Sequence, residues 1–109
     1  MSFDVKVTPP FARRLKRLAK KYHSLKDDLL EVINELEVNP TLGTHIGNEC
    51  YKIRIAIKSK SKGKSGGARL ITYLRVVNEQ VYLLDIYDKS EQSTISDKNL
   101  LSLIDLLPE

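Results

Sequence analysis

The chain has 109 residues and a formal net charge of +4, with the apolar (41%) and charged (29%) fractions of an ordinary globular protein. This length suits one domain, residues 1–109, and the lack of a long apolar run or a signal-like start predicts a cytoplasmic protein without a membrane span. The single cysteine, Cys50, excludes an intrachain disulfide and any zinc site built on paired cysteines.

The first part of the chain predicts a short strand followed by two helices. Residues 3–7 alternate apolar and polar side chains, as a strand with one buried face does. Thr8 followed by proline predicts a helix start, and apolar residues at helical spacing continue to Tyr22. Ser24, with an acidic residue three positions later, predicts a capping box that opens a second helix, which ends at Asn39-Pro40. The short link between the two helices favours an antiparallel hairpin.

The second part predicts a loop, three strands and a final helix. Residues 41–49 are expected to form a loop, and strict alternation of isoleucine with polar residues then predicts a strand. The predicted elements are a strand from Tyr51 to Ile57, a flexible basic loop from Ser59 to Gly67, strands over Ala68–Val77 and Gln80–Tyr87 joined by a tight turn at Asn78-Glu79, and a helix from Ser96 to about Leu107.

The predicted order of elements is β-α-α-β-β-β-α. Three consecutive strands with short links form an antiparallel meander. We therefore predict an α+β fold, in which an N-terminal helical hairpin packs on a largely antiparallel four-stranded sheet and a C-terminal helix completes the domain.

The stretch between Glu49 and Glu79 contains no acidic residue. Its basic residues are Lys52, Arg54, Lys58, Lys60, Lys62, Lys64, Arg69 and Arg75. Alternation along the first of these strands directs the basic side chains away from the isoleucines, and we expect Arg69 to face solvent as well. Since like charges gathered in one patch repel, the arrangement favours binding of an anion. The alternative is a solvated polar face whose lysines suppress aggregation.

The basic loop also resembles part of a phosphate-binding P-loop, at Gly63-Lys64-Ser65. That pattern needs a glycine at position 58, which is lysine, and a following helix, where a strand is predicted. A nucleotide triphosphatase is therefore excluded. The glycines and lysines favour contact with the phosphates of a nucleic acid, or they form a flexible hairpin loop kept soluble by its charge.

Few other residues suit catalysis. A catalytic role for His45, just before the basic strand, stays open, and His23 is assigned none. No Ser-His-Asp set or carboxylate cluster is recognisable, so no metal or other cofactor is expected. Tyr87, at the end of the last strand, could stack on a base or pack at the rim of the core, and Lys89 could contact a phosphate.

Three short motifs together resemble the HigB-like branch of the RelE/ParE toxin superfamily: KIR at residues 52–54, GKSGGAR at 63–69 and YDKSE at 87–91. The resemblance covers residues 39–91, and the flanking helices fit the same layout. It implies the toxin of a toxin–antitoxin pair, which enters the ribosomal A site and cuts mRNA without a metal, through attack of the RNA 2′-hydroxyl on the adjacent phosphate. It also implies a cognate antitoxin that covers the basic surface with an acidic or helical segment.

The resemblance implies roles for individual residues. Arg69 would stabilise the pentavalent phosphorane, Lys52 or Arg54 would transfer a proton or stabilise charge, and Lys89 would contact a phosphate. The residues expected to hold RNA or the ribosome are Lys58, Lys60, Lys62, Lys64, Arg75 and Tyr87. Two other functions stay open: a ParE-like toxin that poisons DNA gyrase, and a nucleic-acid-binding module without catalysis. The cationic set argues against the first, because ParE-like relatives generally lack it.

Overall fold

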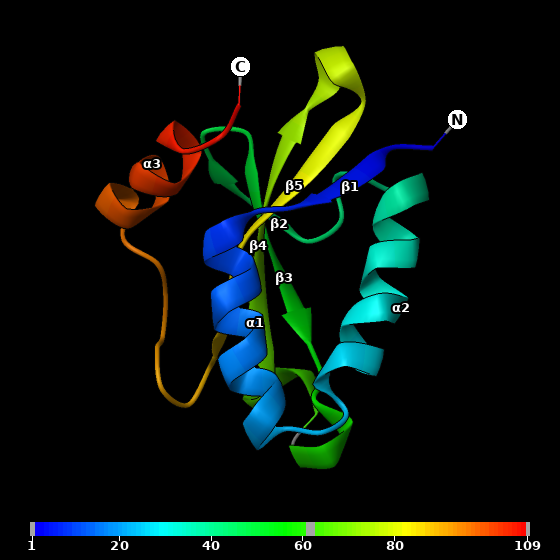
Figure 1. Ribbon diagram of the computed structural model, residues 1–109, viewed down its shortest axis with the longest axis vertical. Helices are drawn as coiled ribbons and strands as arrows, with labels where there is room; N and C mark the ends of the chain where they lie inside the picture. Colours follow the sequence, from blue (N-terminus) through cyan, green and yellow to red (C-terminus); the bar gives the residue numbers. More distant parts are fainter. Residues whose placement is uncertain (1, 61–62, 109) are drawn as a thin grey trace.

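The computed structural model describes residues 2–60 and 63–108 and confirms the α+β class (Figure 1). Three helices and five strands make up the fold: β1 (Asp4–Val7), α1 (Pro9–Lys21), α2 (Leu25–Val38), β2 (Thr44–Gly47), β3 (Cys50–Ile55), β4 (Ala68–Arg75), β5 (Gln80–Asp88) and α3 (Asp97–Asp105). Three short 3₁₀ turns lie between them, at Lys58–Lys60, Lys64–Gly66 and Val76–Asn78.

The strands form one sheet in the order β1-β5-β4-β3-β2. β1 runs parallel to β5, and the other neighbours are antiparallel, as the meander predicted. β4 ends at Arg75 rather than at Val77, because the chain turns into a 3₁₀ helix there.

The prediction of four strands is wrong by one, because part of the expected loop over 41–49 is strand β2. β2 forms a hairpin with β3, with Thr44 opposite Lys52 and His45 opposite Tyr51. The turn between them holds Asn48 and Glu49 at positive φ, 54° and 62°. Two successive residues at positive φ match the right-handed twist of a hairpin, although the usual glycine is missing.

The two helices of the hairpin start in different ways. The predicted cap at Thr8 is present, since its hydroxyl accepts from the Phe11 N–H at 3.4 Å and donates to the Leu83 carbonyl of β5 at 2.7 Å. The predicted capping box at Ser24 does not form, because the Ser24 hydroxyl donates to the Asp28 carboxylate instead, at 2.8 Å. This bond leaves Ser24 free to accept from the Ser59 N–H of the basic loop, at 2.8 Å.

Both faces of the sheet are covered by helices. α1 and α2 pack on one face, where Phe11, Leu25 and Leu36 meet Ile53 and Ile55 in the main core. α3 packs on the other face through Leu100, over a smaller cluster. In Figure 1, α3 lies apart from the α1–α2 hairpin. None of the helices in the described residues is long and apolar enough to cross a membrane.

Candidate functional site

Three strands bring predicted site residues into one row across the sheet. The register places Arg54 of β3 opposite Arg69 of β4, and Arg69 opposite Tyr87 of β5. Residues directly opposite in a sheet share a face, and the intervening Ile53, Ile55 and Leu70 pack under the helical hairpin. The row therefore lies on the face away from α1 and α2, which is the face that α3 covers in part.

Two lysines extend this row. Lys52 is half-buried two positions before Arg54 on β3, and so shares its face. Lys89 is half-buried two positions after Tyr87, and its N–H donates to the Gly67 carbonyl at 3.0 Å. We call Lys52, Arg54, Arg69 and Lys89 the cationic face. The structure thus brings together the four residues that the sequence suggested for catalysis.

Arg69 does not face solvent, contrary to the sequence-based expectation. Its exposed fraction is 4%, because the 3₁₀ turn at Lys64–Gly66 folds over it. The guanidinium donates to the carbonyls of Lys64 at 2.8 Å, Ala68 at 3.1 Å and Ser65 at 3.3 Å. These acceptors are all neutral, so they orient the side chain without cancelling its charge.

The carboxylates nearest to this row in sequence are engaged elsewhere. Asp88 lies opposite Ala68 and faces the helical hairpin, where it bonds Lys60 and Tyr22. Asp85 lies 3.8 Å from Arg14 of α1. Burial, and then the charge of Arg54, lower the pKa of the Arg69 guanidinium from its ordinary value. Both causes disfavour the charged guanidinium, and an anion bound beside Arg54 and Arg69 would offset them by its attraction to both charges.

Tyr87 is fully buried, so its ring does not offer the stacking surface that the sequence suggested. Its hydroxyl has no hydrogen-bond partner that meets the usual distance and angle limits among the described residues. Burial raises the pKa of this phenol, while the charge of Arg69 opposes the rise. Tyr87 is therefore held as a neutral donor beside Arg69.

The lysines of the basic loop differ in their surroundings. Lys58 is exposed and pairs with Glu31 at 3.1 Å, and its N–H donates to Asp28 at 3.0 Å. Lys60 is largely buried in an ion pair with Asp88 at 2.7 Å. Lys64 is exposed beside the carbonyls that hold Arg69. Lys62 lies outside the described residues. A buried, paired Lys60 suits an anchor for the loop better than a contact with RNA.

Two further candidates lie away from the row. Arg75 is six positions from Arg69 along β4, roughly 20 Å away. It donates to the Pro108 carbonyl at 2.6 Å and lies over the rings of Tyr73 and Tyr82. His45 packs against Tyr51, with ring centroids 5.1 Å apart, on the face of the helical hairpin. Neither is placed to act together with Arg69. Among the described residues, no group of three or more His, Cys, Asp or Glu side chains could hold a metal.

The sequence-based reasoning missed the anchor that holds the start of the basic loop. The buried Asp88 carboxylate accepts from Lys60, from the Tyr22 hydroxyl, and from the N–H and hydroxyl of Ser90, the last two at 2.9 and 2.8 Å. Although burial opposes the change, these hydrogen bonds hold the pKa of the Asp88 carboxyl below its ordinary range. The only signal in the sequence was the position of Asp88 inside the YDKSE motif, which does not reveal its partners.

Comparison with known proteins gives one matching family. Residues 11–106 match the family model described as the RelE toxin of the RelE/RelB toxin–antitoxin system. Among solved structures, a double arginine-to-alanine mutant of E. coli toxin RelE in the free state aligns with a TM-score of 0.63 at 17% identity, over 98% of this chain and 100% of that one.

Two other RelE structures give similar alignments. RelE in the archaeal RelE–RelB complex from Pyrococcus horikoshii OT3 gives a TM-score of 0.55 at 16% identity, over 84% of this chain and 100% of that one. Isolated E. coli RelE gives 0.53 at 16% identity, over 97% and 100%. Identities this low show a shared fold, and membership of the HigB-like branch stays a prediction. Because the family model spans most of the sequence, the chain belongs to the RelE toxin family and is the toxin component of a toxin–antitoxin system.

Proposed function

We propose that this toxin is an endoribonuclease that cuts mRNA on the ribosome, and that the cationic face is its active site. The observation that carries the proposal is Arg69, a nearly buried arginine whose hydrogen-bond acceptors among the described residues are neutral carbonyls, and which lies directly opposite Arg54. Repulsion between the two arginines and the burial of the Arg69 charge both cost the folded state free energy. A bound phosphate would offset this cost.

The geometry suits attack of an RNA 2′-hydroxyl on the adjacent phosphorus atom. The new bond gives a pentavalent phosphorane, and loss of the 5′-oxygen leaves a 2′,3′-cyclic phosphate and a free 5′-hydroxyl. Arg69 and Arg54 would stabilise the negative charge of the phosphorane, and Lys89 would hold a neighbouring phosphate. Removal of one such preorganised donor lowers kcat by about 10²–10³ in well-studied enzymes.

More than one residue is a candidate for proton transfer. Lys52 and Arg54 lie on the exposed side of the row, where they could exchange a proton with RNA or stabilise charge. The buried Tyr87 hydroxyl is a neutral donor, which could hydrogen-bond a phosphate or the departing 5′-oxygen only if the turn over Arg69 moved aside. With few groups to move protons, orientation of the 2′-hydroxyl by the ribosome would supply much of the rate, so naked RNA should be cut slowly.

An antitoxin is the expected protein partner. The P. horikoshii structure is a complex of RelE with RelB, and an E. coli RelE mutant was solved with a RelB peptide. We propose that this chain likewise binds an antitoxin, and that an acidic or helical segment of it covers the cationic face and so blocks access of RNA.

Expression in growing cells, followed by mapping of mRNA 5′ ends, tests the function. Wild-type protein should produce new 5′ ends within translated codons, and Arg54→Ala should lower their yield about 100-fold. Arg54 is exposed, so this variant should fold. Lys26→Ala removes the same charge from an exposed site on α2 and serves as the control. Gyrase-linked DNA breaks without new 5′ ends would overturn the proposal in favour of a ParE-like toxin. RNA binding without cuts would show a module without catalysis.

A further inference from the structure

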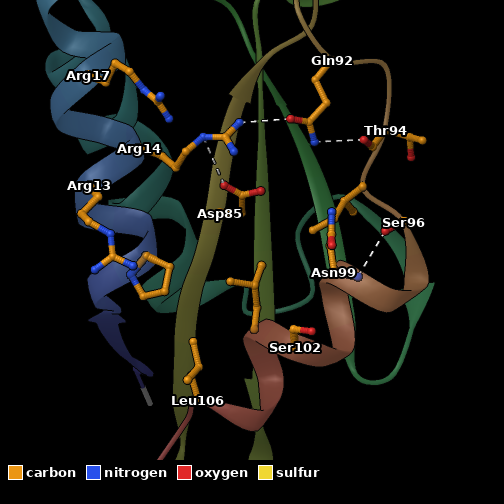
Figure 2. A pocket seen from close by; sticks show the side chains of 13 residues that line it. Arg13, Arg14, Arg17, Asp85, Gln92, Thr94, Ser96, Asn99, Ser102 and Leu106 are labelled. Carbon is orange, nitrogen blue, oxygen red and sulfur yellow. Dashed lines mark hydrogen bonds and ion pairs between the residues drawn. The ribbon is translucent and has the colours of Figure 1, made fainter.

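A cleft with a volume of about 860 Å³ separates α1 from α3, away from the cationic face. Figure 2 shows Arg13, Arg14 and Arg17 of α1 on one wall. The opposite wall is formed by the segment that leaves β5 and by the polar side of α3, including Asn99 and Ser102.

A hydrogen bond and an ion pair fix Arg14, the middle residue of the arginine wall. Arg14 donates from Nη2 to Oε1 of Gln92 at 3.1 Å, and its Nε lies 3.8 Å from Oδ1 of Asp85 on β5. Gln92 in turn donates to the Thr94 carbonyl at 3.0 Å. Dashed lines in Figure 2 mark these contacts, which tie α1, β5 and the connecting segment together. The cleft is therefore shaped by the fold rather than by loose side chains.

The charge of the cleft is positive. Among the described residues that line it, the one carboxylate is Asp85, which Arg14 already pairs. Arg13 and Arg17 are exposed, one helical turn and about 6 Å apart along α1. No ion pair or side-chain hydrogen bond holds either of them within residues 2–60 and 63–108. Two neighbouring cations that nothing engages suit the phosphates of one chain.

The rest of the cleft suits a base and a ribose. Ile95, Leu103 and Leu106 give it an apolar surface, and Leu106 is 69% exposed. Asn99 and Ser102 add hydrogen-bonding groups beside that surface. Cations on one wall and a mixed apolar and polar surface on the other match a nucleotide better than a simple inorganic anion.

A second hollow links this cleft to the end of β5. It has a volume of about 430 Å³ and shares Arg14, Arg17 and Gln92 with the cleft. Its lining reaches Tyr87 and Asp88, which directly precede Lys89 of the cationic face. The hollow is also lined by the carboxylates of Asp88 and Glu91, which pair with Lys60 and Lys21. A single strand that leaves the cationic face near Lys89 would pass beside Arg14 and Arg17 into the cleft.

We propose that the cleft between α1 and α3 is a second RNA site, which holds a nucleotide outside the cut position, with its phosphates on Arg13 and Arg17. The proposal rests on the proposed function only for the choice of RNA as the ligand. The site would act in binding and register, and Arg13 and Arg17 would take no part in proton transfer.

Binding of a labelled 12-nucleotide single-stranded RNA, with 2′-O-methyl riboses that block cutting, tests this site. The variant R13A/R17A is compared with K16A/K20A, which removes two exposed charges at the same spacing from α1 without touching either hollow. Affinity is measured by fluorescence anisotropy at salt concentrations from about 50 to 200 mM. Circular dichroism melts confirm that both variants fold.

The loss of two phosphate contacts should make the plot of log affinity against log salt shallower by about 1.4. The gap in Kd between R13A/R17A and the wild type should then narrow by about sevenfold over this salt range. K16A/K20A should keep the wild-type slope. The variant Leu106→Ala should weaken binding at all salt concentrations without changing the slope, because it removes a contact with a base and no phosphate contact.

Equal salt slopes for R13A/R17A and the wild type would overturn the proposal, as would equal losses of RNA affinity in R13A/R17A and K16A/K20A. It would also be overturned if R13A/R17A bound polyglutamate more weakly than the wild type but bound RNA equally well. This last result would assign the cleft to an acidic protein segment. Since the blocked RNA cannot be cut, the result does not depend on catalysis. Arginine-dependent binding by a protein that cuts no mRNA in cells would refute only the proposed function.

Discussion

Replacing Asp88 with asparagine probes the anchor between the basic loop and the body of the protein. The Asp88 side chain is completely buried and that of Lys60 is only 12% exposed. The new amide has one acceptor oxygen, which can replace either Oδ1, the oxygen facing Lys60 and Ser90, or Oδ2, the oxygen facing Tyr22. It also leaves the Lys60 ammonium without its anion. Removal of one partner from a buried ion pair costs about 3–5 kcal/mol. That is a large part of the roughly 5–15 kcal/mol by which typical domains are stable.

Replacing the other partner of the ion pair, Lys60, should cost less stability. Lys60→Met removes the charge but leaves Asp88 with its donors Tyr22 and Ser90, so we expect a loss of about 1.5–3 kcal/mol, as for one hydrogen bond to a charged group. In the double variant K60M/D88N neither charge of the pair remains, and the loss should be smaller than the sum of the two single losses by about 0.5–3 kcal/mol.

Urea unfolding followed by circular dichroism measures these differences, with E91Q as the control. Glu91 pairs with Lys21 on the surface, where both side chains are 58% exposed, so its loss should not change the unfolding midpoint measurably. A D88N variant as stable as the wild type, or strictly additive losses in the double variant, would refute the reasoning that this pair anchors the loop.

Three other predictions concern stability and reactivity. Hydrogen bonds hold the Asp88 pKa low despite burial, so Asp88 should stabilise the fold above about pH 4, and this contribution should fade as the pH falls further. Below about pH 4 the free energy of unfolding of D88N should therefore depend less on pH than that of the wild type. Burial raises the pKa of the Cys50 thiol to about 12, so thiol reagents near neutral pH should label it only after denaturant is added, and rapid labelling of native protein would contradict the buried position. Gly67→Ala should lower the melting temperature more than Gly63→Ala. At position 67 the new Cβ would lie 2.0 Å from the Ile55 carbonyl oxygen, whereas at position 63 it would meet open space and cost only the roughly 1–2 kcal/mol of a positive φ, 62°. Equal melting temperatures would show that the loop can move away.

Much of the fold could be predicted because the elements with one fully buried face carry a regular pattern of apolar residues. The isoleucines of β3 and the apolar stripes of α1 and α2 report one buried face each, and the structure has those faces. β2 escaped prediction because it is four residues long and none of them is fully buried, so burial leaves no pattern. Its turn uses Glu49 at positive φ, where glycine would have been the signal for a hairpin.

The sequence could predict which residues form the candidate site, but not their burial or their hydrogen-bond partners. Alternation places Lys52 and Arg54 on one face, pairing of the two strands that flank the basic loop would bring Arg69 into the same patch, and the sheet register agrees. The sequence could not show that carbonyls from a 3₁₀ turn would bury Arg69, since the lysines and glycines of residues 59–67 predict a loop but not which of its carbonyls turn back onto β4. Nor could it separate Lys60 from Lys64, because the difference lies in Asp88, 28 residues away from Lys60.

The parallel pairing of β1 with β5 has a consequence for the time course of synthesis. The hydroxyl that caps α1 also bonds a carbonyl 75 residues further along the chain. At about 5–20 residues per second, roughly 4–15 s separate the synthesis of these two positions. During that interval β1 has no strand to pair with and the row through Arg69 lacks its β5 member. A nascent chain of this toxin thus carries an unfinished sheet until β5 is complete, and its charged surface takes final form only after β5 has been made.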